Sequence, residues 1–77
     1  MDIEKFVQEF ANQFDMVPAE EFTPETHFKE NEEWDSMTAL SIIAMADDSY
    51  NVRLTGDDIR TSVTVQDIFD IVVSKVK

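Results

Sequence analysis

Apolar residues recur along residues 2–15 with the spacing of a helix. They fall three, four, seven and eleven positions after the first one and so form one stripe: Ile3, Phe6, Val7, Phe10 and Phe14. Asp2 is placed to cap the start of such a helix, and Pro18 ends the pattern. The pattern therefore predicts an amphipathic helix over residues 2–15.

Residues 36–50 and 64–76 show the same periodicity. Thr64 is a favourable N-cap, and Asp67 stands three residues later, where a capping box places its acid. Asp35 is a favourable N-cap for the segment 36–50, which is apolar over more of its circumference than residues 2–15. Its outward face is predicted to be weakly polar and to contain Thr38, Ser41, Met45 and Asp48.

Two connections join these predicted helices. In the long loop 16–34, Phe22 and Phe28 are expected to pin the chain to the core. In the segment 51–63, the run from Gly56 to Ile59 can open a short helix. We therefore predict an all-α protein: a four-helix bundle of three longer helices and a short third one, folded as a single domain over residues 1–77.

The charge of the chain restricts its partners. It contains 17 acidic and 6 basic residues, a formal net charge of −11. Nucleic acids and anionic membranes repel such a chain, so we expect neither as a partner and expect basic protein surfaces instead. No apolar run approaches the ~20 residues that cross a bilayer, and the acidic start has no signal-peptide layout. We expect a cytoplasmic monomer.

Few side chains are suited to catalysis. The chain has no cysteine and a single histidine, His27, so the usual nucleophile–base pairs are excluded. The single glycine excludes a glycine-rich phosphate loop, and the acidic run 47–51 does not have the spaced ligands of a calcium loop. We therefore expect neither an enzyme nor a metal site.

Ser36 is the remaining candidate for chemistry. It stands between an acidic loop and an apolar helical segment, where a helix N-terminus presents free backbone N–H groups that favour a phosphate. From the residues alone, Ser36 is either an ordinary helix-start residue or the place where a phosphate-linked group is attached.

The sequence Asp35-Ser36-Met37 resembles the Asp-Ser-Leu/Met attachment motif of the acyl carrier protein family. The resemblance covers nearly the whole chain, because the turn 56–59 and Val63-Thr64-Val65 also fall where that family has them. It implies that a phosphopantetheinyl transferase moves 4′-phosphopantetheine from coenzyme A onto Ser36. The thiol of this arm then carries acyl groups as thioesters between enzymes, so the protein is a shuttle rather than a catalyst.

The resemblance also implies a docking surface and an acyl pocket. Members of this family dock a negative second helix onto basic patches of acyl-loading and acyl-transfer enzymes. The positions that match this surface are Asp35, Met37, Met45, Asp47 and Asp48. An acyl chain in this family lies between the second and third helices, and the matching positions for that pocket are Ala46, Leu54 and Ile59.

The cargo stays open at this point. Fatty-acid synthesis is the first interpretation, but fatty-acid carriers commonly have acids where this chain has Thr38 and Ser41. Asp-Ser-Met also occurs in D-alanyl carriers, and Trp-Asp-Ser occurs in stand-alone carriers of specialised pathways such as polyketide-type ones. An acidic interaction or inhibitor module would explain the charge and the helices, but it gives no reason for the motif at Ser36.

Overall fold

A computed structural model describes residues 2–15 and 18–76, and in these ranges the chain forms helices and no β-strand. The four α-helices are α1 (Ile3–Ala11), α2 (Ser36–Tyr50), α3 (Gly56–Thr61) and α4 (Val65–Lys75). The long connection between α1 and α2 contains two 3-10 helices, η1 (Ala19–Glu21) and η2 (Phe28–Glu30). The prediction of an all-α bundle with a short third helix is confirmed.

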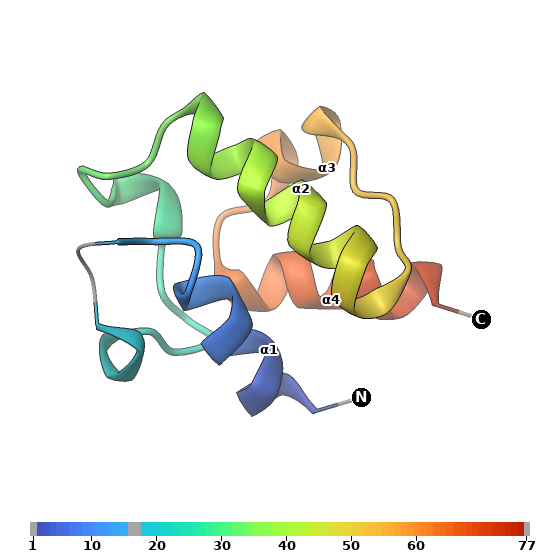
Figure 1. Ribbon diagram of the computed structural model, residues 1–77, viewed down its shortest axis with the longest axis horizontal. Helices are drawn as coiled ribbons and strands as arrows, with labels where there is room; N and C mark the ends of the chain where they lie inside the picture. The colour runs from blue at the N-terminus through green and yellow to red at the C-terminus, as the bar shows by residue number, and fades with distance from the viewer. Residues whose placement is uncertain (1, 16–17, 77) are drawn as a thin grey trace.

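Figure 1 shows how the elements are arranged. Helix α2 runs obliquely across the front, α1 and α4 lie below it, and α3 lies beside its upper part. The connection from α1 to α2 forms the left side of the molecule and delivers the chain to the upper end of α2. The start of α2 is therefore held at one end of the molecule, away from both termini.

The helix ends are fixed by side chains that the sequence placed there. At the start of α4, Thr64 accepts a hydrogen bond from the Asp67 backbone N–H, and Asp67 accepts one from the Thr64 N–H at 3.1 Å. Thr55 and Asp58 form a second capping box at the start of α3. The C-cap of helix α2 is Asn51, which has a left-handed backbone with φ 55°. These local devices satisfy backbone groups that a helix end leaves without partners.

Aromatic rings fill the centre of the bundle. Phe6 and Phe10 of α1 are fully buried. The ring of Phe10 meets that of Phe28 edge to face with a centroid distance of 5.1 Å, and Phe28 meets Trp34 in the same way at 4.9 Å. Phe22 and Phe28 are both buried, so the predicted anchoring of the long loop is confirmed.

Helix α1 ends earlier than the sequence predicted. The helix expected over residues 2–15 stops at Ala11, and Gln13 and Phe14 then donate to carbonyls three residues back, as in a tighter turn. This turn carries the Phe14 ring into the core, where it packs 5.0 Å from the ring of Phe22. Phe14 thus reaches the core from a tighter turn and not from the helix itself.

The outward face of α2 also differs from the prediction. Thr38 and Met45 were expected on this face, but they are buried, with exposed fractions of only 8% and 7%. Met37 and Leu40 are exposed instead, at 70% and 59%. The reason is that α1 packs along the side of α2 that carries Met45, which turns the neighbouring side outward.

Candidate functional site

Ser36 is the first residue of α2, and its side chain is exposed. Within the described ranges no hydrogen bond engages its hydroxyl group. Because this hydroxyl is exposed at the first position of a 15-residue helix, its oxygen can act as a nucleophile toward an incoming phosphorus centre.

Asp35 holds the start of α2 in place. Its carboxylate accepts hydrogen bonds from the Thr38 backbone N–H at 2.9 Å and from the Thr38 hydroxyl at 3.1 Å. The Thr38 hydroxyl also lies 3.2 Å from the Glu33 carbonyl oxygen, so the helix and the preceding loop are joined here. The backbone N–H of Thr38, followed by its hydroxyl, lowers the pKa of Asp35 from the ordinary 3.8. Asp35 is therefore the ionised N-cap of α2, as the sequence predicted.

An open groove lies beside Ser36, between the start of α2, the segment leading into it and α3. Its volume is about 370 Å³, and Ser36 itself forms part of the lining. Trp34, Ala39 and Ile59 provide apolar surface along it. The groove is open above Gly56, because a Cβ atom built there would meet no other atom within 4 Å.

Two basic side chains border the same groove. The Lys29 ammonium donates a hydrogen bond to the Arg60 backbone carbonyl at 2.8 Å, which ties η2 to α3. The Arg60 guanidinium pairs with Asp57 on its own helix. The Asp35 carboxylate lines the groove as well, so basic and acidic side chains both border the space beside Ser36.

The residues predicted to contact partners are only partly brought together. Met37, Asp47 and Asp48 are exposed on α2, whereas the burial of Met45 withdraws it from that surface. Sequence reasoning missed Leu40, which is exposed although its side chain is apolar. The signal in the sequence that could have indicated this exposure was the position of Leu40, one turn after Ser36.

The residues predicted to line an acyl pocket are buried. Ala46 and Leu54 belong to the packed core, whereas Ile59 also reaches the groove beside Ser36. Ser62, on the same side of the bundle, is buried too, and its hydroxyl donates to the Asp58 carbonyl at 2.8 Å. An internal acyl pocket thus stays a prediction.

Residues 2–15 and 18–76 contain neither a cluster of metal ligands nor a membrane-spanning helix. No group of three or more acidic or histidine side chains there is arranged to hold a metal ion. The same residues contain no helix with the length and apolar character needed to cross a membrane. His27 is half exposed and lies 3.1 Å from a Glu30 carboxylate oxygen.

Comparison with known proteins identifies the family of the chain. Residues 4–72 match the family model described as the phosphopantetheine attachment site. The chain is 35% identical over 54 residues to an acyl carrier protein of Thermobifida fusca (strain YX), an alignment that covers 70% of this chain and 68% of that protein. No solved structure matches significantly. Because the family model spans most of the helical bundle, the chain belongs to the acyl carrier protein family, whose cofactor is 4′-phosphopantetheine.

Proposed function

We propose that 4′-phosphopantetheine is attached to the hydroxyl oxygen of Ser36 and that the holo protein carries acyl groups in fatty-acid synthesis. The observation that carries this proposal is the exposed Ser36 at the start of α2, within the motif Asp35-Ser36-Met37. In the attachment step, Oγ forms a bond to the phosphorus that bears pantetheine, the bond from this phosphorus to the bridging oxygen of the coenzyme A pyrophosphate breaks, and adenosine 3′,5′-bisphosphate leaves. The hydroxyl proton passes to a base of the transferase. The protein then acts as a carrier rather than an enzyme, as a cytoplasmic monomer.

Intact-mass measurement tests the attachment. We expect the wild-type protein, incubated with coenzyme A and a broad-specificity phosphopantetheinyl transferase, to gain the mass of one phosphopantetheine. Ser36→Ala should gain nothing, because it has no hydroxyl to modify at this position. Ser49→Ala is the matched control, since Ser49 is an exposed serine on the same helix. A wild type that gains no mass, or a Ser36→Ala variant that gains it, would show the proposal to be wrong.

We also propose that partner enzymes bind the exposed side of α2. Met37 and Leu40 offer apolar surface within a turn of Ser36, and the first turn of the helix contains no acid. The exposed acids Asp47 and Asp48 lie eleven and twelve positions further on, about 17 Å along the helix axis. A matching partner would present an apolar patch near its active-site entrance and basic residues about 17 Å away. Such partners would include the transferase and the acyl-loading and acyl-transfer enzymes.

Charge reversal at Asp48 is expected to slow the transferase. We predict that Asp48→Lys lowers kcat/KM for modification roughly fivefold at low salt, because replacing an attraction by a repulsion weakens docking by about 1 kcal/mol in total. Added salt should narrow the difference from wild type. The control is Glu25→Lys, which makes the same charge change on an exposed residue of the long loop. Equal rates for Asp48→Lys and Glu25→Lys at low salt would remove Asp48 from the docking surface.

The cargo can be assigned by loading the holo protein. The absence of acid in the first turn of α2 favours a second candidate, a carrier of D-alanine or of another specialised acyl group. We would offer the holo protein to an acyl-ACP synthetase with a fatty acid, and to a D-alanine ligase. Loading by the synthetase is expected, and loading by the ligase alone would contradict the fatty-acid assignment. The remaining alternative, an acidic interaction module without an arm, does not fit a chain of this family.

A further inference from the structure

We propose that a second groove, between α1 and α2, seats a basic amphipathic helix of a partner protein, so that α1 takes part in docking as well as α2. This inference rests on the proposed docking of partners to α2 and deepens it. It places the partner helix on the α1 side of α2 rather than on the α3 side, where the groove beside Ser36 lies.

Two hollows follow the α1 side of α2 and run into one another. The first, of about 620 Å³, lies between the end of α1 and the middle and last turns of α2. The second, of about 390 Å³, lies between the first turns of α2 and the loop residues that approach them. Gln13 and Ser41 line both hollows, so the two form one groove, the α1–α2 groove. From Met37 to Asp48 it follows α2 for about 17 Å, the length of three helical turns.

Acidic side chains line the α1–α2 groove along its whole length. Each hollow has three of them: Glu9, Asp47 and Asp48 in the first, and Asp15, Glu33 and Asp35 in the second. No lysine, arginine or histidine of the described ranges lines either hollow. The negative charge of this groove therefore has no basic neighbour within the lining to offset it.

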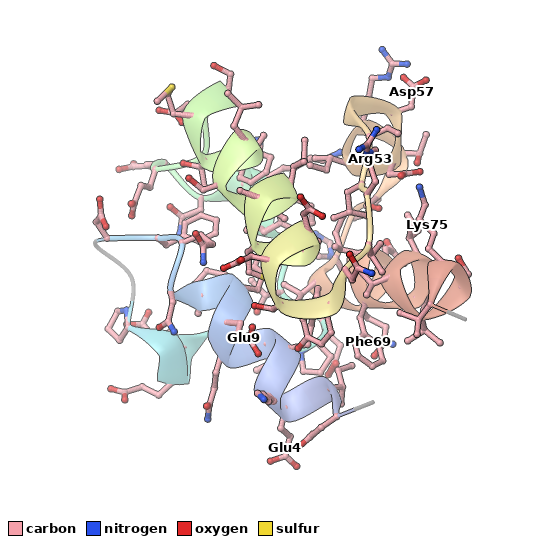
Figure 2. All side chains as sticks on the ribbon, turned by 45° about the vertical axis from the view of Figure 1, so that its right-hand side comes forward. Glu4, Glu9, Arg53, Asp57, Phe69 and Lys75 are labelled. Carbon is pink, nitrogen blue, oxygen red and sulfur yellow. The ribbon has the colours of Figure 1, made fainter. Side chains whose placement is uncertain are left out.

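The basic side chains are concentrated elsewhere. Four of the five basic residues in the described ranges lie in α3 or beside it: Lys29, Arg53, Arg60 and Lys75. Lys29 and Lys75 are held there, because their ammonium groups donate to the backbone carbonyls of Arg60 and Arg53 at 2.8 and 2.9 Å. Figure 2 shows Arg53 and Lys75 on the α3 side of the molecule and Glu9 on α1. The net charge of −11 is thus least compensated at the α1–α2 groove, which attracts a basic partner.

The floor of the groove selects the kind of basic partner. Met45, only 7% exposed, and Ala44 line the first hollow, and the exposed Met37 lines the second. An amphipathic helix fits this arrangement, because its apolar stripe covers the floor while flanking lysines and arginines meet the carboxylates. Methionine adapts to apolar side chains of different shapes. Residues 2–15 and 18–76 form no β-strand whose edge an extended segment can join, which leaves a helix as the fitting occupant.

A synthetic probe tests the groove. We would titrate isotope-labelled protein at low salt with a leucine–lysine peptide of about 14 residues, which forms a basic amphipathic helix of four turns. In NMR spectra the backbone amides of Asn12, Ser41 and Ala44 should shift most, and those of Gly56 and Arg60 should stay in place. Shifts that are largest at α3, or no binding at millimolar peptide, would overturn the proposal. Shifts of the groove amides with concentration of the protein alone would assign the groove to a second copy and overturn it too.

Two variants separate the groove from the overall charge. Asn12→Lys and Ser74→Lys each add one positive charge at an exposed position, but only Asn12 lines the groove. At low salt Asn12→Lys should raise the Kd of the peptide about threefold, whereas Ser74→Lys should leave it nearly unchanged. Thermal unfolding verifies that both variants are folded. Equal changes in Kd would show that net charge alone attracts the peptide, and the groove would be wrong.

The same titration distinguishes this inference from the docking proposal on which it rests. Asp48 lies on α2 itself and also lines the groove, whereas Asn12 belongs to the end of α1. If Asp48→Lys weakens peptide binding and Asn12→Lys does not, docking to α2 stands and the role of α1 is refuted. If neither variant weakens binding, both proposals fail. Weakening by both is the expected result.

Discussion

Phe28→Ala is expected to reduce the free energy of unfolding by about 3–5 kcal/mol, the usual effect of truncating a fully buried phenylalanine. Phe28 is only 1% exposed, and its ring packs edge to face against Phe10 and Trp34. A domain of this size has a total stability of about 4–12 kcal/mol, so the loss is a large part of the whole. Urea unfolding followed by far-ultraviolet circular dichroism measures it.

The effect should also reach the functional site. Phe28 belongs to η2, and Trp34 stands two residues before Ser36, so losing the ring loosens the segment that delivers Ser36 to α2. Met37→Ala is the control, because a side chain that is 70% exposed should change stability by no more than about 0.5 kcal/mol. A loss below about 1 kcal/mol for Phe28→Ala would mean that other contacts anchor the long loop.

The parts of the fold that depend on local chemistry could be predicted from the sequence. The start of α4 follows from Thr64 and Asp67, whose reciprocal hydrogen bonds need only neighbouring residues. The start of α2 at Ser36 follows in the same way from Asp35. Both helices begin where the pattern placed them, because capping energies are set within one helical turn.

The rotation of α2 could not be predicted, because it depends on packing between distant segments. The side-chain types of Thr38 and Met45 alone would allow either residue to lie on the buried or on the exposed face of an apolar helix. The position of α1 against α2 buries Met45, and the Glu33 carbonyl binds the Thr38 hydroxyl. Leu40 is left exposed as a consequence. The end of α1 at Ala11 could not be predicted for the same reason, because Phe14 packs against Phe22, a residue of the long loop.

The candidate site, too, has a part that local sequence predicts and a part that depends on distant segments. Ser36 was identified from a local motif, but the groove beside it is built from three separate segments: η2 with Lys29, the start of α2, and α3 with Gly56 and Arg60. The start of α3 is itself tied to a distant residue, because Lys75 of α4 pairs with Asp58 at 2.8 Å and donates to the Arg53 carbonyl at 2.9 Å. Figure 2 shows the Lys75 side chain extending from α4 toward α3. Sequence spacing contains no information about such long-range neighbours.

Acid is expected to remove the difference in stability between wild type and Asp67→Asn. In the folded protein the Asp67 carboxylate accepts hydrogen bonds from the backbone N–H groups of Val63 at 2.9 Å and Thr64 at 3.1 Å. These bonds, that of Val63 first, lower the pKa of Asp67 from the ordinary 3.8. A group whose pKa is lower in the folded state stabilises the protein fully above its unfolded pKa. That stabilisation is lost as the pH falls below 3.8 toward the folded pKa.

Comparing the two proteins isolates this effect from the overall charge. Protonation of the many acids also relieves self-repulsion in a chain of net charge −11, but this occurs almost equally in wild type and variant. At pH 7 the urea midpoint of Asp67→Asn should lie below that of wild type, and the two should converge as the pH falls below 3.8 toward the lowered pKa of Asp67. Asp70→Asn is the matched control, because it removes one charge from the same helix and its carboxylate accepts from the Gln66 side chain rather than from the backbone. A difference for Asp67→Asn that stays constant from pH 7 to about pH 2 would show that ionisation of Asp67 does not secure the start of α4.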